Sequence, residues 1–423
     1  MVTRSDVVVV GAGVVGLSTA FHLARKGAQV DLVDAGEAGS GASRNNAGWV
    51  VPSMSEPVPS PAALRTAAKW AWRKDSPLKI GVEPSARYVY FLARMLMASR
   101  PSAFERGLEA TAALAAGAIA AFDDLERAGV SVERHSDGVL LLFVDERGIE
   151  PHLRDLRAAE RAGLPPALPL DAREVADLEP GVGPKVVGGI LCAGDQHVDP
   201  SSLVDGLMAQ CLAAGVRFRS GAPVTDLVDD GDRVSLTAGG ERMEAGSMVI
   251  AAGVGSRDVA ARLGVRIPIR AGKGYGFDFL RPPVQVRHAV YLTDHKVAVT
   301  PMDRGLRIAG TMEFGSENGT VDSRRAAGIA RAMPSYFSPW DAELPQPWCG
   351  LRPMSPDGLP VIGRLPTRSP VYVATGHAML GITLGPVTGS LLSSLVLDGT
   401  HSPLLEPFRP SRFLGRRGRR PRP

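Results

Sequence analysis

The chain has 423 residues, 44% of them hydrophobic, and this composition excludes a disordered chain and predicts a globular protein with a full core. Seven arginines within residues 409–423 outweigh the formal net charge of +4, so the rest of the chain carries −3 and gives no argument for a nucleic-acid partner. Three widely spaced cysteines, Cys192, Cys211 and Cys349, argue against a disulfide framework, a zinc site or a dithiol redox centre.

The N-terminal segment reads as a βαβ unit. Residues 6–10, "DVVVV", form an unalternating β-branched run that is typical of a buried parallel strand. A helix is expected from Val14 to about Lys26, ended by Gly27, and a second strand ends at Asp34. Because the strand begins almost at once, we expect no signal peptide and a cytoplasmic protein.

The turn of this unit carries the pattern G-x-G-x-x-G at Gly11, Gly13 and Gly16. The first glycine permits the tight turn, the second lets a pyrophosphate approach the backbone, and the third allows close packing of helix on strand. Asp34 stands where an acid hydrogen-bonds the ribose hydroxyls. We therefore expect a dinucleotide here, in contact with Val10, Gly11, Ala12, Gly13, Val14, Val15, Gly16, Asp34 and Ala35.

The loop that follows, "GSGASRNNAGWV" at 39–50, is rich in Ser, Asn and Gly and is suited to line a second length of an extended cofactor. Its expected contacts are Ser43, Asn45, Asn46, Ala47 and Gly48. The fingerprint occurs once, and no C-x-x-C pair accompanies it, which disfavours a pyridine-nucleotide disulfide reductase. Together with a glycine-rich C-terminal helix, these features favour FAD over NAD.

The middle of the chain changes character. Alanine-rich amphipathic helices are expected at 62–73, 88–98 and 103–128, then a strand pair that turns at Asp137 and Gly138, then a helix at 149–162. The helix within 63–79 combines Trp70 and Trp72 with basic residues, which suits either a membrane surface or a cap on the domain. The run at 88–98 is too short to span a bilayer.

From residue 200 the first pattern returns, with a helix at 201–214, short strands, and the buried run "SMVIAAG" at 247–253. Val224, Ala252 and Gly253 are added here to the expected cofactor contacts. Residues 265–349 are rich in strands, and Tyr275 in "KGYGFDF" either covers the substrate with its hydroxyl or is a half-buried strand tyrosine.

Arg352 lies in "WCGLRPMSPDGLPVIG", where prolines and glycines predict a rigid backbone. Flavin-dependent oxidation of an amino acid requires a cation that holds the carboxylate, and the planar fork of arginine binds a carboxylate through two bonds. We therefore interpret Arg352 as the carboxylate clamp. The alternative is an arginine paired with Asp357 to fix the turn.

A last strand, "PVYVATG", precedes a helix at 382–396 whose N-terminus would suit the negative charge of a reduced flavin. His377 is expected to hydrogen-bond the cofactor, and the histidines show no metal-ligand spacing, so no metal is predicted. The expected contacts of this segment are Gly376, His377, Gly381, Ile382 and Thr383.

The order of elements predicts an α/β fold in which a Rossmann-like FAD-binding domain is interleaved with a substrate domain that holds a mixed, largely antiparallel sheet. The first domain is assigned to 1–55, 165–262 and 350–400, and the second to 56–164 and 263–349. Residues 401–423 are expected to form a basic, disordered tail.

With these residues placed, the sequence resembles the glycine oxidase and D-amino-acid oxidase superfamily, and most of all its bacterial D-amino-acid dehydrogenases. The likeness reaches to about residue 400, and its clearest stretches are "VVVVGAGVVGLSTAFHLARKGAQVDLVD", "NNAGWVVPS", "GKGYGF", "GLRPMSPDGLPVIG" and "TGHAMLGITLGPVTG". The resemblance implies noncovalent FAD and oxidative deamination of a D-amino acid to a 2-oxo acid and ammonia. It assigns the carboxylate clamp to Arg352.

The resemblance also implies transfer of electrons to a membrane quinone chain, and hence peripheral contact with the inner face of the cell membrane. Met379 departs from the pattern, because glycine oxidases place a second arginine there. Rival readings are an oxidase or dehydrogenase of glycine, sarcosine, D-proline or D-hydroxyproline, and a flavin-free protein that binds nucleic acid through its arginine-rich end. The residues leave chirality, substrate side chain, acceptor and oligomeric state open.

Overall fold

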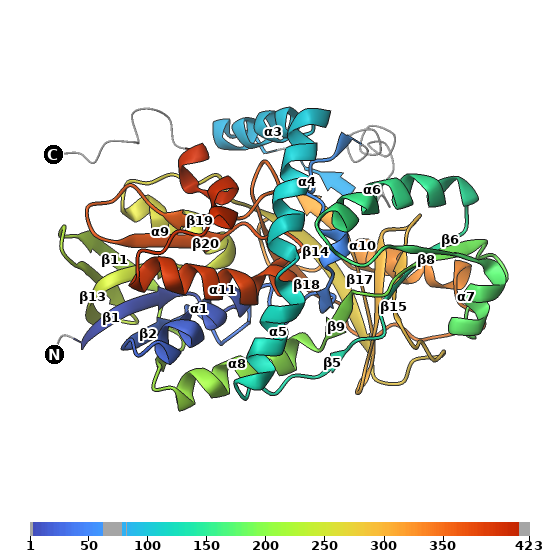
Figure 1. Cartoon of the computed structure of the whole chain (residues 1–423), viewed down its shortest axis with the longest axis horizontal. Coiled ribbons are helices and arrows are strands. Elements are labelled where there is room, and N and C mark those ends of the chain that lie inside the picture. The colour runs from blue at the N-terminus through green and yellow to red at the C-terminus, as the bar shows by residue number, and fades with distance from the viewer. Residues whose placement is uncertain (1–2, 62–77, 82, 414–423) are drawn as a thin grey trace.

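The computed structural model describes residues 3–61, 78–81 and 83–413. Two large sheets lie along the long axis of the molecule, and helices α4 (Pro101–Ala115) and α5 (Ala118–Arg127) cross between them (Figure 1). The expected α/β fold is confirmed. The helix predicted at 62–73, and most of the basic tryptophan segment, lie outside the described residues.

The first sheet has eight strands in the order β10-β2-β1-β13-β12-β11, with β20 beside β13 and β19 beside β20. The pairs among β10, β2, β1, β13 and β20 are parallel, whereas β12, β11 and β19 join antiparallel. The strands are β1 (Thr3–Val10), β2 (Val30–Val33), β10 (Arg217–Arg219), β11 (Val224–Asp229), β12 (Val234–Ala238), β13 (Glu241–Ile250), β19 (Val361–Arg364) and β20 (Val371–Thr375).

Apolar side chains on both faces explain why these parallel strands read as unbroken hydrophobic runs. Helix α1 (Val14–Arg25) packs against α8 (Pro200–Ala213) and α11 (Gly381–Leu397) on one face. The short α9 (Ser256–Arg262) follows β13. The predicted βαβ unit is confirmed, and Gly27 has the positive φ of 89° expected of a residue that ends a helix.

The second sheet has nine strands in the order β18-β14-β17-β16-β15-β6-β8-β7, with β4 beside β17. It is mixed and largely antiparallel, since only the pairs β15–β6 and β17–β4 are parallel among those described. The strands are β4 (Leu78–Ile80), β6 (Val139–Phe143), β7 (Leu168–Asp171), β8 (Gly188–Cys192), β14 (Arg270–Phe279), β15 (Ala289–Leu292), β16 (Val297–Met302), β17 (Gly305–Phe314) and β18 (Trp348–Met354).

Short elements complete the described part of the chain. A small third sheet pairs β3 (Trp49–Val50), β9 (Gln196–Val198) and β5 (Arg134–His135). The remaining α-helices are α3 (Ala86–Ala98), α6 (Ile149–Arg161), α7 (Ala172–Leu178) and α10 (Ser323–Ala330). Turns of 3-10 helix are η1 (Pro52–Met54), η2 (Glu146–Gly148), η3 (Gly253–Gly255), η4 (Met333–Ser335), η5 (Pro403–Phe408) and η6 (Pro410–Arg412).

Three sequence expectations need correction. The segment 103–128 forms two helices rather than one, with the break at Ala116 and Gly117. The strands on either side of Asp137 and Gly138 do not pair with each other, because β5 joins β9 whereas β6 joins β8 and β15. The strands β7 and β8 also join the second sheet, although their residues lie in the range 165–262 that we proposed for the first domain.

A further correction concerns the chain after residue 400, of which residues 401–413 are ordered. Leu405 and Phe408 in η5 are buried in the core of the first sheet. Arg412 forms an ion pair with Asp357 at 2.8 Å and donates to the carbonyls of Leu359 and Pro360. The basic composition of this segment therefore gave no sign that Leu405 and Phe408 are buried. No described helix is long and apolar enough to cross a bilayer.

Candidate active site

A cavity of about 620 Å³ opens at the carboxyl ends of the parallel strands of the first sheet. Val10 ends β1, Asp34 follows β2, Ala252 follows β13, and Thr375 ends β20, and all four line it. Open parallel sheets bind their ligands outside these ends of the strands. The volume lies in the range of small-molecule and cofactor sites.

The glycine turn shapes one wall of this cavity. Gly11 has a φ of 109°, which favours glycine, and a Cβ atom on Gly16 would stand 1.8 Å from the Gly11 carbonyl oxygen. Helix α1 begins directly after Gly13, which offers no side chain to cap it. The Ser43 hydroxyl accepts instead from the Val14 N–H at 3.0 Å. The remaining N–H groups and the helix dipole suit a phosphate.

The Asp34 carboxylate is fixed by the backbone around it. One oxygen accepts from the Ala12 N–H at 2.6 Å and the other from the Gly36 N–H at 2.8 Å. Each oxygen keeps a second lone pair, because a carboxylate accepts about four hydrogen bonds. The acid is thus held at the cavity wall with capacity left for ribose hydroxyls.

The asparagines of the loop 39–50 hold the loop in shape. The Asn46 amide donates to the carbonyls of Ala42 and Ser43, and its oxygen accepts from the Gly48 N–H. The Asn45 amide donates to the Cys349 carbonyl at 3.2 Å and so ties the loop to β18. Asn46 lines the cavity, whereas Asn45 does not.

Arg352 brings a positive charge to the cavity from β18. Its Nη1 donates to the Thr311 carbonyl at 2.9 Å, and burial lowers the pKa of its guanidinium to about 10, so it is charged near pH 7. No ion pair joins it to a carboxylate anywhere in the described chain. The alternative pairing with Asp357 is wrong, because Asp357 pairs with Arg412. A half-buried cation that lacks an anion suits an anionic ligand.

Tyr275 does not face the guanidinium. A Cβ on the preceding residue, Gly274, would stand 2.2 Å from Arg352 Nη1, so Gly274 faces the guanidinium. Neighbouring residues of a strand point to opposite faces, and Tyr275 accordingly packs in the core of the second sheet. Its hydroxyl donates to Glu313 at 3.0 Å. Burial raises the pKa of this hydroxyl most, and the hydrogen bond to Glu313 raises it further. The predicted assistance from Tyr275 does not fit this geometry.

His377 lines the cavity, and its ring contacts helix α11 on the side away from the cavity. Its Nε2 lies 3.1 Å from the Thr388 hydroxyl in α11, and burial lowers the pKa of the ring to about 4, so the ring is neutral near pH 7. Helix α11 directs its N-terminus, at Gly381 and Ile382, to the same wall. A neutral ring beside a helix N-terminus leaves the positive end of the helix dipole as the electrostatic feature of this wall.

The structure brings most of the predicted cofactor residues to one cavity. Those that line it are Val10, Gly11, Gly13, Val14, Val15, Asp34, Ala35, Ser43, Asn46, Val224, Ala252, Gly253, His377, Gly381 and Ile382. Those that lie behind the wall are Ala12, Gly16, Asn45, Ala47, Gly48, Gly376 and Thr383. The second group acts through packing and loop contacts, as when the Thr383 hydroxyl bridges the Trp49 carbonyl and the Val51 N–H.

Other lining residues were not predicted as contacts. Leu351 and Pro353 flank Arg352 on β18, and Asp258 and Arg262 come from α9. No pattern in a single sequence shows that the residues on either side of Arg352 also line the cavity. The signal for α9 was its position directly after the buried strand β13, the place where ligands bind in such sheets.

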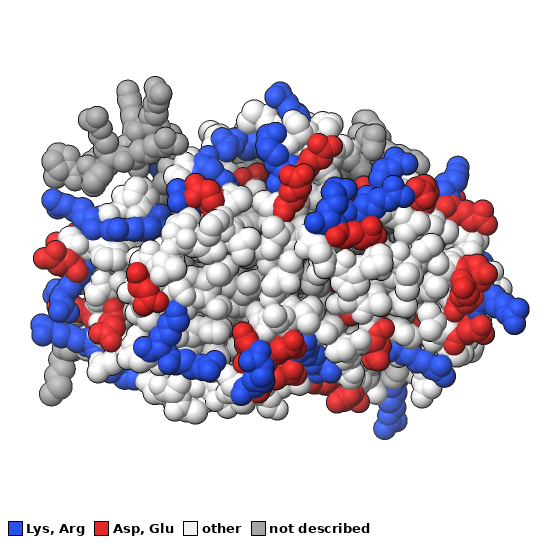
Figure 2. Space-filling view, viewed as in Figure 1, with Lys and Arg blue, Asp and Glu red and all other residues white. Residues whose placement is uncertain are grey.

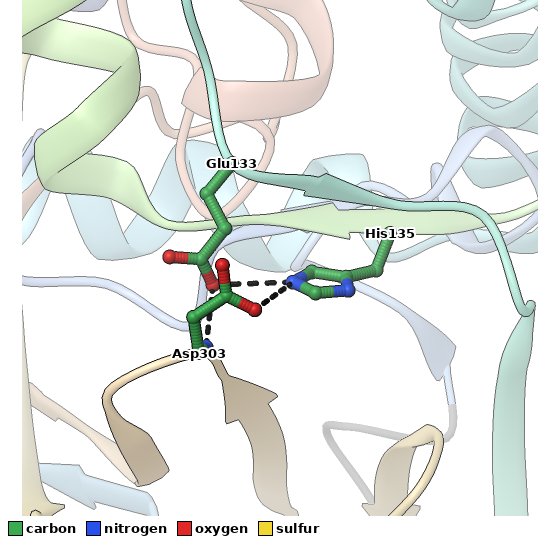
Figure 3. Close-up of side chains that lie close together, drawn as sticks. All are labelled: Glu133, His135 and Asp303. Atoms are coloured by element: carbon green, nitrogen blue, oxygen red, sulfur yellow. Dashed lines mark hydrogen bonds and ion pairs between the residues drawn. The ribbon is translucent and has the colours of Figure 1, made fainter.

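A separate group of ionisable side chains lies outside this cavity (Figure 3). Glu133 and His135 come from β5 and its approach, and Asp303 comes from the turn between β16 and β17. Glu133 Oε1 accepts from the Asp303 N–H at 2.9 Å and lies 3.1 Å from His135 Nε2. The Asp303 side chain is 77% exposed. The Asp303 N–H and the His135 ring thus fix the position of the Glu133 carboxylate.

Comparisons with known proteins agree with the cavity. The sequence matches the FAD dependent oxidoreductase family, DAO, over residues 6–395. It is 32% identical over 406 residues to a D-amino acid dehydrogenase of Cereibacter sphaeroides, covering 93% of this chain and 92% of that protein. It is 33% identical over 407 residues to one of Paramagnetospirillum magneticum, covering 92% and 94%.

Among solved structures, a glycine oxidase from Geobacillus kaustophilus superposes with a TM-score of 0.73 at 24% identity, covering 98% of this chain and all of that chain. This likeness shows the fold. The glycine turn, the oriented Asp34 carboxylate and the N-terminus of α11 fit the phosphates, ribose and isoalloxazine of FAD. The cofactor of the protein is therefore FAD.

Proposed function

Because the chain belongs to the DAO family of FAD-dependent oxidoreductases, we propose that it oxidatively deaminates D-amino acids to 2-oxo acids and ammonia. The observation that carries this proposal is Arg352, whose half-buried side chain lines the FAD cavity and is given no carboxylate by the described residues. An amino acid supplies that carboxylate. The names of the two relatives support the D configuration.

FAD, when bound, supplies the acceptor for the hydride that leaves the substrate Cα. The amine loses a proton in the same oxidation, and water then hydrolyses the imine to the oxo acid and ammonia. Arg352 holds the carboxylate so that Cα keeps one orientation, which is the main protein contribution when no strong base is required. The Thr311 carbonyl holds the guanidinium in turn.

We further propose that FAD is bound without a covalent link. Cys349 is the cysteine nearest to the clamp in the sequence, but it does not line the cavity. Its thiol donates to the Gly319 carbonyl at 3.1 Å. Cys349 packs against the same hydrophobic cluster of the second sheet that contains Tyr275. Cys192 and Cys211 are buried in the hydrophobic core.

For the acceptor, we propose a membrane quinone that is reached by peripheral contact. The support is helix α3, which stands at one edge of the molecule (Figure 1). Tyr88, Phe91 and Met95 bury one face of it, while four large apolar side chains on another face are 45–63% exposed: Val89, Tyr90, Leu96 and Met97. Figure 2 shows basic side chains near this edge. An apolar face with basic neighbours suits a membrane surface.

A second candidate is oxidation of glycine, sarcosine or a cyclic secondary amine such as D-proline or D-hydroxyproline. The exposed Met379 favours it, because this apolar side chain lines the same cavity as Arg352 with 57% of its surface accessible, and glycine, sarcosine and D-proline carry no polar side chain that would need a polar partner there. Dye reduction with a panel of both enantiomers of each amino acid, measured beside peroxide release, separates the candidates and identifies the acceptor class.

The test of the proposed function is Arg352→Ala beside Arg352→Lys. Loss of a buried bidentate contact costs roughly 3–5 kcal/mol, so we expect the substrate KM to rise about 100-fold or more in Arg352→Ala. The lysine variant keeps the charge but not the fork, and it should recover only part of the loss. The FAD absorption spectrum should stay normal in both.

The matched control is Arg364→Ala, which removes an exposed arginine at the end of β19. Its KM should equal that of the wild type. If Arg352→Ala oxidised amino acids with an unchanged KM, the clamp would be disproved. If the wild type oxidised none of the panel, the substrate class would be wrong.

A further inference from the structure

Arg262, the last residue of helix α9, lines the FAD cavity with an exposed side chain. Its Nη1 donates to the Thr225 carbonyl at 2.6 Å. Thr225 directly follows Val224, which also lines the cavity. The hydrogen bond therefore holds the guanidinium at the cavity wall, one residue away from Val224.

This stretch of wall adjoins the acid that is suited to bind ribose. The Ala222 N–H donates to the Asp34 carbonyl at 2.7 Å, and the whole segment 222–224 lines the cavity. The glycine turn and the N-terminus of α1, which suit the phosphates, are also joined to Asp34, through the Ala12 N–H. Asp34 thus stands between the phosphate wall and the wall that contains Arg262.

The parts of FAD follow one another in a fixed order, which runs from the isoalloxazine through the pyrophosphate and the ribose to the adenine. The N-terminus of α11 fits the isoalloxazine, the glycine turn fits the pyrophosphate, and Asp34 fits the ribose. The adenine is bonded to that ribose, so it lies next to Asp34 on the side away from the phosphates. The segment 222–224 and Arg262 form the wall there.

The guanidinium of Arg262 has contacts to spare for a ligand. Its bond to the Thr225 carbonyl uses one of five N–H donors, and no carboxylate of the described chain pairs with it. Asp258, which lines the cavity from the same helix, pairs with Arg257 at 3.4 Å. A guanidinium that is tethered at one nitrogen keeps a flat, charged face, and such a face stacks well on an aromatic ring.

We propose that Arg262 binds the adenine of FAD by stacking its guanidinium on the face of the base, while the Thr225 carbonyl holds the guanidinium in place. Arginine side chains stack on nucleobases in the same way that they stack on aromatic side chains. The contact concerns the cofactor alone, so it is independent of the amine that the protein oxidises.

The test titrates the full-length protein, after FAD has been dialysed away, with three probes. FAD is the whole cofactor, AMP is its adenosine half and FMN is its flavin half. In Arg262→Ala we expect the Kd of FAD and of AMP to rise about 10-fold, while the Kd of FMN stays at the wild-type value. Arg262→Lys keeps the charge and a donor for the Thr225 carbonyl but has no flat face, so it should recover only part of the AMP affinity.

The matched control is Arg266→Ala, which removes an exposed arginine just after α9 that does not line the cavity. All three Kd values should equal those of the wild type. An unchanged AMP Kd in Arg262→Ala would overturn the inference. So would an equal loss of AMP and FMN affinity, which would mean that the variant disturbs the whole cavity, or full recovery of AMP affinity in Arg262→Lys.

These titrations are separate from the test of the proposed function. If none of the amino acids were oxidised but AMP affinity depended on Arg262, the substrate class would be wrong and the adenine contact would stand. If amino acids were oxidised and AMP affinity did not depend on Arg262, the contact would be wrong and the function would stand.

Discussion

The guanidinium of Arg352 has room because β14 carries glycine at alternate positions. A Cβ on Gly274 would stand 2.2 Å from Arg352 Nη1, and one on Gly276 would stand 2.3 Å from the Trp348 ring. On a strand, alternate residues share a face, so these glycines form a floor for the long side chains of β18. The position of the clamp is therefore set by two strands.

This floor makes Gly274→Ala a test of placement without removal of any polar group. The added methyl must displace the guanidinium, because contacts below 3.0 Å are not tolerated. We expect the substrate KM to rise about 10-fold or more while the FAD spectrum is unchanged. Gly319→Ala is the control, since nothing lies within 4 Å of its Cβ. Equal KM values in the two variants would contradict the role of the floor.

At the residue scale, the sequence predicted Arg352 as a site residue because its chemistry and its stiff setting are both visible locally, and Arg352 does line the cavity. Tyr275 was misplaced because the side of a strand that a residue faces is decided by the neighbouring strands. The carbonyl contact of Thr311 could not be predicted at all, since the β-bulge at Thr311 exists only where β17 pairs with β14. Contacts across strands are decided by tertiary packing, which composition and spacing do not encode.

Among the elements, helix α3 has two apolar faces, and only one of them is packed. Val89, Leu96 and Met97 follow the spacing of one helical stripe on the exposed side. In water an exposed apolar stripe is unfavourable, whereas at a membrane surface it can enter the boundary of the acyl chains. The stripe is the part of α3 that the core does not explain.

We therefore expect Leu96→Glu to lower binding of the holoenzyme to vesicles of anionic lipid by several-fold. A charge in the apolar stripe is repelled by the headgroups and cannot enter the acyl region. Ala116→Glu, at an exposed position at the end of α4, is a control for the charge alone outside α3. Flotation of the two variants with vesicles measures the effect, and soluble-dye turnover should be unchanged. Equal flotation would remove α3 from the membrane contact.

The long periodic helices and strands were predicted well, whereas the pairing of strands within the sheets was not. The first strand and helix and α6, α8 and α11 lie within a few residues of their expected bounds. The strands β5 and β6 are adjacent in sequence and carry a turn signal at Asp137 and Gly138, yet they enter different sheets. The packed segment after residue 400 was also missed, because two buried side chains in a short proline-containing run leave no period to detect.

Across the whole molecule, buried ionisable groups oppose one another in their effect on acid stability. Burial lowers the pKa of His22, His197 and His377 to about 4, so the unfolded chain binds more protons than the fold between pH 4 and 6.5. Through these groups, stability is lost as the pH falls. Burial raises the pKa of Asp195 and Glu56 to about 7, so the fold binds more protons in that range and stability is lost as the pH rises.

Asp195→Asn isolates one side of this balance. Asp195 is 1% exposed and accepts from the backbone N–H and hydroxyl of Ser53. Asparagine can still accept from that N–H and does not ionise. Between pH 5 and 8 the wild type must ionise a buried acid, so the unfolding free energy of the variant, relative to the wild type, should rise by at least ~1 kcal/mol over that range and level off above about pH 7.

Urea unfolding at pH 5 and pH 8 measures this difference, with the exposed Asp137→Asn as the control. A difference between Asp195→Asn and the wild type that is the same at both pH values would show that Asp195 is already ionised in the fold at pH 5. The three histidines would then act without an opposing acid at this position, and the wild type would lose stability more steeply below pH 6.5. The slope of wild-type stability from pH 6.5 down to 4.5 thus checks the same balance independently, because opposing groups flatten it.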